Sequence, residues 1–322
     1  MLTPGYSLTA SERVLPRLAI DFTTAVADPR VTTARAGDTA TRINSSGVIE
    51  IVNANLPRFD YDPTTLVCKG QLVEDPRTNL FLNSLIDGTN LATQSVTLTA
   101  AAHTLSFYGS GSVSISGGHT ATVDGFGNYP ARVVYTFTPS AGSTTFTVTG
   151  DVKYAQIELG AFVTSFIPTA GTSVLRNADV LTMSGTNFTD WFNPAQGSFV
   201  FRGSVRTGST RHALNGLLST ERFMTVSSGG GLGISDGVGS AATATGTGSG
   251  VTFTGTCSYG PTTLAVAING NTAATGSSGN VLGAATQLQV GRRGAIYING
   301  YVEKLLYFPQ QLTLAEMAAF SK

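Results

Sequence analysis

The sequence predicts an all-β protein, in which a β leader is followed by two antiparallel β-sandwich (jelly-roll) domains and a short C-terminal helix. Apolar and polar residues alternate with period two in many short segments. The 38 glycines include many at turn positions, and only short stretches have a helical pattern. Single cores stop growing near about 250–300 residues. The chain has 322 residues, so we expect three parts, at 1–82, 83–170 and 171–322.

Residues 1–82 are predicted to form a leader, or attachment segment, of short strands. Residues 17–23 and 43–53 are typical of strands, and an extended segment is expected to stop at Pro63. We expect three aromatic side chains to be buried against the following jelly roll, namely Phe22, Phe59 and Tyr61. Charged side chains are expected to form a network that fixes the entry strands, namely Arg58, Asp60, Asp62, Glu74 and Arg77. Glu74 and Arg77 either pair or each hold a neighbouring loop.

The second and third parts both have the pattern of β-sandwiches. In residues 83–170, segments such as 112–116 and 145–149 alternate strictly, so each presents one apolar and one hydroxylated face. In residues 171–322, Asn269-Gly270 and Asn299-Gly300 are strong hairpin signals, because both central residues of a type I′ turn need positive φ. The chain closes with the capping box Thr313-x-x-Glu316, which predicts a short helix.

Charge and hydropathy exclude two classes of partner. Lys+Arg and Asp+Glu both number 19, so the formal net charge is zero. A protein that binds nucleic acid electrostatically needs a basic surplus, and we expect no nucleic-acid partner. No window reaches the roughly 18–20 consecutive apolar residues that span a bilayer, so we expect no membrane insertion. The first ten residues lack the features of a secretory signal, and synthesis in a cytoplasm is expected.

A search for catalytic and metal-binding residues finds no convincing set. Asp60 and Asp62 alternate along one predicted strand, so they point to one face and could form a carboxylate pair or a calcium site. The favoured interpretation is that they cap turns before Pro63. The three histidines are isolated from one another and from other ligands at metal-site spacing. We therefore predict no catalytic residues, no metal and no cofactor, and expect that the protein is not an enzyme.

Two aromatic clusters are candidates for glycan binding. Sugar rings stack on aromatic faces, while amides and carboxylates hold their hydroxyls. A Gly-rich loop combines these groups in Asp124, Phe126, Asn128 and Tyr129, and its glycines would let backbone approach a ligand. Trp191 is the single tryptophan of the chain and lies beside acidic and amide residues. A core position is the favoured alternative for Trp191.

Several segments give the chain a resemblance to a known family. Residues 18–23, 30–32, 44–49, 57–63 and 70–80 resemble the leader of tailed-bacteriophage virion proteins, of the tail fibre, spike or head-decoration type. Residues 151–169 resemble the last strands of the carbohydrate-binding jelly roll that follows this leader. The third part, with its ends at 300–302 and 307–313, is similar to the concanavalin-A-like lectin/laminin-G domains of the same proteins.

The resemblance implies a component of the virion that is made in the host cytoplasm. Its implied partners are itself, other virion proteins of capsid or tail, and host surface polysaccharide. Because few charges protect its β modules, we expect a symmetric homo-oligomer, most simply a trimer. The leading hypothesis is a structural spike, fibre or decoration protein that binds host glycan. The alternatives are a capsid cement protein that stabilises the head without binding sugar, and a glycan hydrolase.

Overall fold

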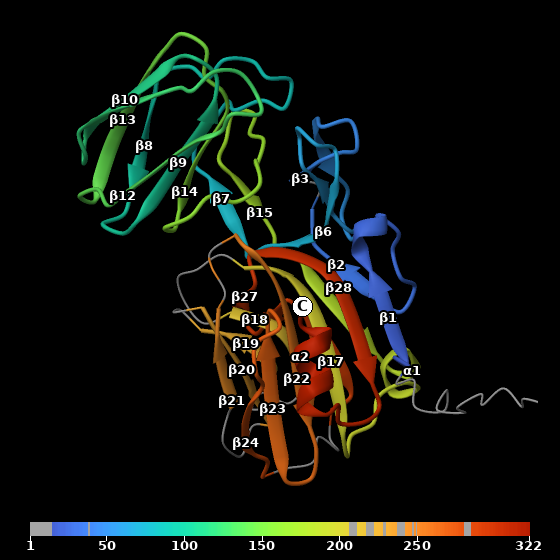
Figure 1. Ribbon diagram of the computed structural model, residues 1–322. Helices are drawn as coiled ribbons and strands as arrows, with labels where there is room; N and C mark the ends of the chain where they lie inside the picture. Colours follow the sequence, from blue (N-terminus) through green and yellow to red (C-terminus); the bar gives the residue numbers. More distant parts are fainter. Residues whose placement is uncertain are drawn as a thin grey trace, which may run out of the picture.

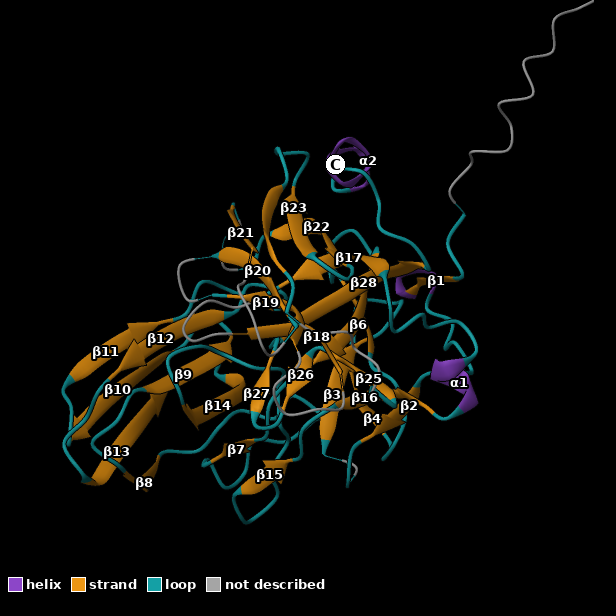
Figure 2. Ribbon diagram, turned by 90° about the horizontal axis from the view of Figure 1, so that it is seen from below, coloured by secondary structure: helices purple, strands orange, loops and turns teal. Residues whose placement is uncertain are grey.

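The chain folds into two antiparallel β-sandwiches of different size, joined by a short two-stranded stem (Figure 1). The computed structural model describes residues 15–37, 39–205, 211–216, 222–227, 230–236, 242–246, 248, 250–279 and 285–322. The predicted all-β class with a C-terminal helix is confirmed. Helices are confined to short elements on the larger sandwich, as Figure 2 shows. In the described residues no helix is long and apolar enough to cross a membrane.

The larger body, called the large sandwich here, has one eight-stranded sheet and one seven-stranded sheet. In sheet order, the first contains β24 (Ala274–Ser277), β23 (Thr263–Ile268), β22 (Thr252–Tyr259), β17 (Gly197–Ser204), β28 (Gly300–Phe308), β6 (Cys68–Val73) and β5 (Phe59–Tyr61), with β1 (Leu18–Asp21) also paired to β28. The second contains β2 (Thr32–Ala34), β16 (Val180–Ser184), β25 (Gln287–Val290), β18 (Arg211–Gly216), β19 (Arg222–Val226), β20 (Gly231–Ser235) and β21 (Ala242–Thr245).

Strands from the first part of the chain complete both sheets of the large sandwich. Strand β1 pairs with β28 from Leu18 opposite Tyr307 to Asp21 opposite Lys304. Strand β2 pairs with β16, and β6 pairs with the other end of β28. The predicted leader is therefore built into the third part of the chain rather than standing apart from it, because its apolar strand faces are needed to close that core.

The aromatic residues of the first part are buried, but in the large sandwich. Phe22 and Phe59 belong to the same core as Phe199, and Tyr61 packs against that core. The prediction that they pack against the jelly roll is therefore wrong. Phe22 directly follows β1, which pairs with β28, while Phe59 and Tyr61 lie in β5, which pairs with β6. These pairings place the aromatic side chains in or against the core of the large sandwich.

The smaller body, called the small sandwich here, covers residues 80–171 and follows the predicted alternation. Its four-stranded sheet has β11 (Ala121–Asp124), β10 (Ser112–Gly117), β13 (Gly142–Thr149) and β8 (Gln94–Leu98), and its three-stranded sheet has β12 (Val133–Phe137), β9 (His103–Tyr108) and β14 (Lys153–Leu159). Its core is a separate cluster that includes Phe81, Phe107 and Phe146. Every fully buried member of that cluster lies between residues 81 and 157.

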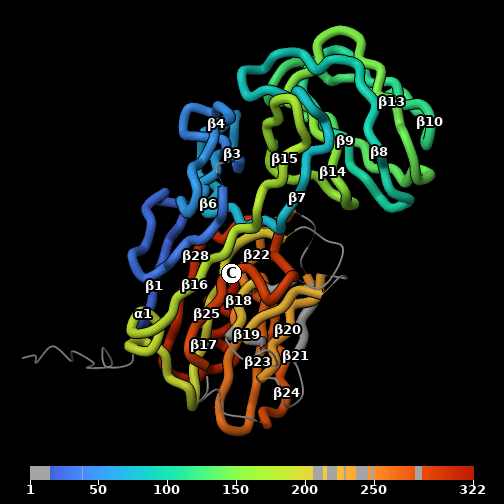
Figure 3. The backbone as a smooth tube through the Cα atoms, turned by 180° about the vertical axis from the view of Figure 1, so that it is seen from behind, coloured from blue at the N-terminus to red at the C-terminus, as the bar shows by residue number. Residues whose placement is uncertain are grey.

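The stem is a pair of antiparallel strands, β7 (Arg77–Asn79) and β15 (Val174–Arg176), seen side by side in Figure 3. Val174 lies opposite Asn79, and Arg176 lies opposite Arg77. The chain thus enters and leaves the small sandwich at one place, so the small sandwich is an insertion in the large one. Asn79 anchors the entry, because its side-chain amide donates to the carbonyls of Ala155 and Ile167, at 3.1 and 2.8 Å.

The remaining elements are short. A hairpin of β3 (Ala40–Ile43) and β4 (Ile49–Val52) stands beside the stem, and β26 (Arg292–Arg293) pairs with β27 (Ile296–Tyr297). A 3-10 turn covers Phe22–Thr24 and α1 covers Thr186–Thr189. Helix α2 (Leu314–Phe320) begins at Thr313 with the predicted capping box, since the Thr313 hydroxyl accepts from the Glu316 amide and the Glu316 carboxylate accepts from the Thr313 amide.

Candidate binding sites at the junction and on the large sandwich

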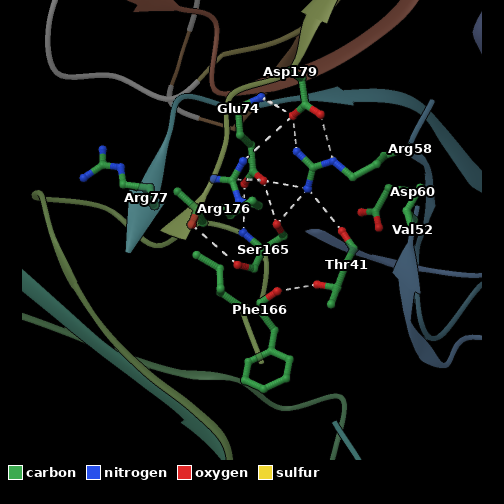
Figure 4. Close-up of polar contacts among 12 residues, drawn as sticks. Thr41, Val52, Arg58, Asp60, Glu74, Arg77, Ser165, Phe166, Arg176 and Asp179 are labelled. Carbon is green, nitrogen blue, oxygen red and sulfur yellow. Dashed lines mark hydrogen bonds and ion pairs between the residues drawn. The ribbon is translucent and has the colours of Figure 1, made fainter. Parts of the chain in front are cut away.

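A buried ionic cluster, called the junction cluster here, lies where the stem meets the large sandwich (Figure 4). It consists of Arg35, Arg58, Glu74, Arg176 and Asp179, whose side chains are all at most 2% exposed. Arg58 is its centre. One of its amino groups donates to Glu74 Oε2 at 2.9 Å and to Ser165 Oγ at 2.8 Å. The other amino group and Nε donate to the Asp179 carboxylate.

The junction cluster connects segments that are far apart in sequence. Arg35 donates to Asp179 Oδ1 at 3.0 Å, and the backbone amide of Glu74 donates to Asp179 Oδ2, also at 3.0 Å. Ser165 of the small sandwich donates to Glu74 from both its amide and its hydroxyl, at 2.8 and 2.7 Å. These bonds hold together three parts of the chain: the segment before the stem that contains Arg35, the residues Glu74 and Asp179 on either side of the stem, and the loop of the small sandwich that contains Ser165.

Three arginines and two carboxylates give the junction cluster a surplus of one positive charge (3 − 2 = 1). Burial by itself would raise the pKa of Glu74, but Arg176 and Arg58 outweigh it and hold that pKa far below its usual range. Burial likewise opposes the charge of Arg58, yet Asp179 and Glu74 keep its pKa raised. Removing either carboxylate would therefore leave buried cations without compensation.

The predicted leader network is found in part. Arg58 and Glu74 are paired, but Arg77 forms its ion pair with Asp75, at 2.9 Å from Asp75 Oδ1, and lies over the Phe162 ring. The prediction that Glu74 and Arg77 share a network is therefore wrong, because Arg77 sits on the stem with its side chain turned away from the cluster, as Figure 4 shows.

The two aspartates of residues 56–63 separate instead of forming a pair. Asp60 is buried, where it accepts from the Ile43 amide and from the Tyr301 hydroxyl, both at 2.6 Å. Asp62 accepts from the amides of Thr64 and Thr65, at 3.0 and 2.8 Å, and so caps a turn as the favoured interpretation expected. A pair of carboxylates for catalysis or calcium binding is not present at these two residues.

Sequence reasoning missed three members of the junction cluster, namely Arg35, Arg176 and Asp179. Arg35 and Asp179 are 144 residues apart, so no local spacing links them. The available signal was the scarcity of charge, since charged residues are only 12% of the chain. In such a chain, arginines within otherwise apolar or hydroxylated segments are candidates for buried ion pairs.

Next to the junction cluster lies a small cavity, called the junction pocket here, of about 90 Å³. Both sandwiches line it. The large sandwich and its hairpin supply Thr41, Arg42, Ile43, Ile49, Asp60, Leu72, Glu74 and Tyr301, and the small sandwich supplies Tyr108, Arg132, Thr164, Ser165 and Phe166. Burial raises the pKa of Asp60 in this wall, while Glu74 is held ionised by its arginines. The pocket therefore combines aromatic, hydroxyl and guanidinium groups.

The Gly-rich loop does not bring its four predicted residues to one face. Its backbone is bonded to the turn between β9 and β10, by reciprocal bonds of Gly127 with Gly109 and by a bond from the Gly125 amide to the Gly111 carbonyl. Asp124, Phe126 and Asn128 are exposed, Phe126 at 76%. Tyr129 instead packs its ring 5.1 Å from that of Tyr108, and its hydroxyl is buried. Phe126 and Tyr129 thus face different environments.

Trp191 is a core residue, so the prediction that it binds glycan is wrong. Its side chain is part of the large core and the residue is 4% exposed. Its Nε1 donates to the Asn187 carbonyl at 2.6 Å, and its ring packs against Phe188, Phe199 and Tyr307. The short helix α1 places Asn187 one turn before Trp191, which satisfies the indole inside the core.

A larger hollow, called the bulge groove here, lies on the eight-stranded sheet and has a volume of about 500 Å³. A β-bulge in β28 creates it. Arg202 of β17 lies opposite Lys304, but Gly203 lies opposite Val302, so Glu303 is an extra residue. On the other side of β28, β1 reaches Lys304 and β6 begins pairing at Val302, which leaves a gap between those two strands.

Gly70 allows β6 to approach the bulge. It has a φ of +95°, and a Cβ at this position would lie 2.3 Å from the Val302 carbonyl oxygen. No side chain fits there. The close approach places Lys69 beside the groove, with its ammonium 4.3 Å from the centre of the Tyr301 ring.

Most charges that line the bulge groove are paired. Glu303 binds Arg202 Nε at 2.8 Å and the Thr252 hydroxyl at 2.9 Å, and Lys304 pairs with Asp21 at 2.9 Å. Lys69 makes no salt bridge within the described part of the chain. The groove therefore presents one ammonium without a salt-bridge partner in the described residues, next to an aromatic ring. Among the described residues, no group of three or more His, Cys, Asp or Glu side chains is placed to hold a metal ion.

Comparisons with known proteins give only distant matches. No family model and no curated protein matches the chain. A sialidase of Trypanosoma rangeli matches at 12% identity and a TM-score of 0.36, over 44% of this chain and 26% of that chain. Botulinum neurotoxin type C, described as entering cells through two ganglioside molecules, matches at 10% identity and 0.33, over 44% and 39%. Domains LG4-5 of the mouse laminin α1 chain match at 10% and 0.28, over 76% and 91%.

Proposed function

We propose that this chain is a non-catalytic structural component of a phage particle, and that it binds a host-surface glycan through the bulge groove. The proposed place in a virion rests on the resemblance of residues 18–80 to the leader of phage virion proteins. The proposed glycan binding rests on one observation, which is the combination of groups around Tyr301 at the bulge of β28.

The chemistry of the groove suits a saccharide. Its volume of about 500 Å³ falls within the range of roughly 300–1,000 Å³ that is usual for ligand sites. Asn299 and Thr252 offer an amide and a hydroxyl for sugar hydroxyls, and Tyr301 offers a ring. Lys69 adds an ammonium without a salt-bridge partner, which favours a glycan that carries negative charge.

The groove lacks the groups that glycoside hydrolysis requires. Hydrolases of this kind use two carboxyl groups that flank the scissile bond. Among the described residues that line the groove, Glu303 is the only acid, and Arg202 and Thr252 already bind both of its oxygens. A reducing-end assay with host polysaccharide tests the hydrolase alternative, and release of new reducing ends would overturn the non-catalytic proposal.

The decisive experiment is a glycan array probed with the parent protein and with Lys69→Gln. Lys69 makes no salt bridge in the described residues, so its replacement should leave the fold intact while weakening glycan binding about tenfold, or roughly 1.4 kcal/mol. Lys153→Gln is the matched control, because Lys153 is a partly exposed lysine on the small sandwich. No glycan bound by the parent, or equal binding by parent and Lys69→Gln, would overturn the proposal.

A capsid cement role without sugar binding is the second candidate, favoured by several exposed apolar side chains in the first part of the chain. Val48, Ile51, Leu56, Leu66 and Val67 are each 44–62% exposed. Exposed apolar side chains that form a contiguous patch are often covered by a partner. Covering by further copies, in the proposed homotrimer, is tested by light scattering of the purified protein, and a monomer at micromolar concentration would speak against it.

A further inference from the structure

Beside the junction cluster, whose Arg35 and Arg176 also have buried nitrogens without a hydrogen-bond partner, two further buried polar atoms near the junction pocket have no partner. They are Nε of Arg132 and the hydroxyl of Tyr129. Nearly all buried polar atoms in proteins are hydrogen-bonded, so such exceptions call for a physical reason. Arg132 lines the junction pocket, and Tyr129 packs against Tyr108, which lines it as well.

Arg132 is held in place by bonds that do not neutralise it. Its two amino groups donate to the Thr164 carbonyl at 2.8 Å and to the Ser106 hydroxyl at 2.9 Å. Its guanidinium lies 5.7 Å from the centre of the Tyr108 ring. Within the described residues Arg132 makes no salt bridge, whereas the other arginine of the pocket, Arg42, pairs with Glu50 at 2.6 Å. The charge of Arg132 acts on the buried carboxyl group of Glu158, but Gln156 and Thr164 provide the hydrogen bonds of that carboxyl group. The Nε of Arg132 is thus available to an anion.

The two carboxyl groups of the pocket wall do not pair with Arg132. Glu74 is bound by Arg58, Arg176 and Ser165. Asp60 accepts from the Ile43 amide and the Tyr301 hydroxyl, and burial raises its pKa. The nearby junction cluster contributes one further positive charge.

We infer that the junction pocket is a second ligand site, which binds a carboxylate group through Arg132 and thereby bridges the two sandwiches. The volume of about 90 Å³ equals the space of roughly three water molecules at about 30 Å³ each. That is enough for a carboxylate and its neighbouring carbon, while the rest of a ligand extends past Arg42, whose side chain is 29% exposed. The ligand is either a small free acid or an acidic sugar unit of a polysaccharide.

Binding between the two sandwiches has a measurable consequence. A ligand that contacts Arg132 on one side and Thr41 or Tyr301 on the other stabilises the docked arrangement, and any ligand that binds only the folded form raises the melting temperature. Glucuronate, glucose and acetate are the probes. We expect glucuronate to raise the melting temperature of the full chain at millimolar concentration and glucose, which lacks the carboxylate, to leave it unchanged.

Arg132→Gln should weaken the glucuronate response at least tenfold, and the surface control Lys153→Gln should respond like the parent. Acetate matching glucuronate would support a small free acid as the ligand, and glucuronate binding alone would support an acidic sugar. Equal responses to glucose and glucuronate, or an unchanged response of Arg132→Gln, would overturn the inference.

If Arg132→Gln does not fold, Arg42→Gln is tested in its place. Arg42 lies at the solvent side of the pocket, so its replacement should leave the fold intact. At least a threefold loss of the glucuronate response is expected, and no loss would overturn the inference. Lys69→Gln separates the two sites in the same measurement, because Lys69 lines the bulge groove and not the junction pocket. A glucuronate response that Lys69→Gln keeps and Arg132→Gln loses belongs to the junction pocket, whereas a response lost in Lys69→Gln and kept in Arg132→Gln belongs to the groove and overturns the inference.

Discussion

The small and the large sandwich are built from the same kind of alternating strand but are assembled in different ways. All strands of the small sandwich come from one continuous segment, and its core uses only residues 81–157. The large sandwich combines residues before the stem with residues after it, since β1, β2, β5 and β6 enter sheets formed mainly by strands after residue 179. The small sandwich therefore needs no strand from outside its own segment. The large sandwich depends on contacts between residues that are more than a hundred positions apart in the sequence.

The largest effect is expected when the chain is cut at the stem. The isolated segment 77–176 should fold, because it contains its complete core. The isolated segment 171–322 should not, because it lacks β1 and β6, which pair with β28, and Phe22 and Phe59 of the core. Circular dichroism and calorimetry of both fragments test this difference. A cooperative melting transition of segment 171–322 would show that the first part of the chain is dispensable.

The next effect separates buried from exposed ion pairs at the junction. Asp179→Ala leaves Arg35 and Arg58 buried without their shared carboxylate, and should cost about 3–5 kcal/mol of unfolding free energy. Asp75→Ala is the matched control, because Asp75 pairs with Arg77 near the surface and its side chain is 22% exposed. It should cost at most about 1 kcal/mol.

The same contrast revises the expected effect of Arg77→Ala. If Arg77 paired with Glu74, its removal would strand a buried carboxylate and cost roughly 1–3 kcal/mol. Because its partner is the partly exposed Asp75, the loss should stay below that range. Urea denaturation of the variants measures each value, and a loss for Asp75→Ala or Arg77→Ala as large as that for Asp179→Ala would contradict the assignment of the buried cluster.

The sequence was informative where structure is local. Alternation in segments such as 112–116 predicted strands of the small sandwich, and Thr313 with Glu316 predicted the start of the last helix. It was not informative where contacts are distant. Nothing near Asp179 in the chain indicates that Arg35 and Arg58 bind it, because pairing across 144 and 121 residues is set by the docking of whole elements.

The candidate sites were hard to predict for the same reason. The bulge groove needs β1, β6 and β28 to meet, and the junction pocket needs both sandwiches. The aromatic composition of a segment could not distinguish exposed Phe126 from buried Trp191, because exposure depends on which elements cover each residue.

Acid is expected to affect the two sandwiches in opposite directions. The pKa of Glu74 is depressed in the folded protein, so its contribution to stability is present above its unfolded value of 4.5 and is lost as pH falls below that value. Burial raises the pKa of Glu158 in the small sandwich, so its contribution is present at low pH and is lost as pH rises through its folded value. The pKa of Asp60 is also raised, so its effect on stability in acid is opposite to that of Glu74 and offsets it in part.

Chemical denaturation of the full chain and of segment 77–176 near pH 7 and below pH 4.5 tests this difference. The full chain should lose roughly 1–3 kcal/mol through Glu74 on acidification, and the segment, which lacks Glu74, should not. Glu74→Gln in the full chain should reduce the acid-dependent loss. An equal loss in Glu74→Gln and the parent would show that Glu74 is not the group responsible.

The smallest effect is expected at the Gly-rich loop. Phe126→Ala should change the unfolding free energy by no more than about 0.5 kcal/mol, because the side chain is 76% exposed. Tyr129→Ala should cost more, since it removes the packing against Tyr108. Array binding of both variants tests whether the loop adds to glycan recognition. Binding that is abolished by Phe126→Ala but unaffected by Lys69→Gln would move the glycan site from the groove to the loop.

The stem has an evolutionary consequence. Strands β7 and β15 lie side by side, at the spacing of roughly 4.8 Å that separates paired strands. A gene segment that codes for residues 80–173 therefore encodes a domain whose two ends lie next to each other in the folded protein. Recombination at this point can exchange one displayed domain for another and leave the core of the large sandwich untouched. The incoming domain would have to match the contacts that cross the junction, above all those of Ser165 with Glu74 and Arg58, of Phe166 with Thr41 and of Asn79 with Ala155 and Ile167.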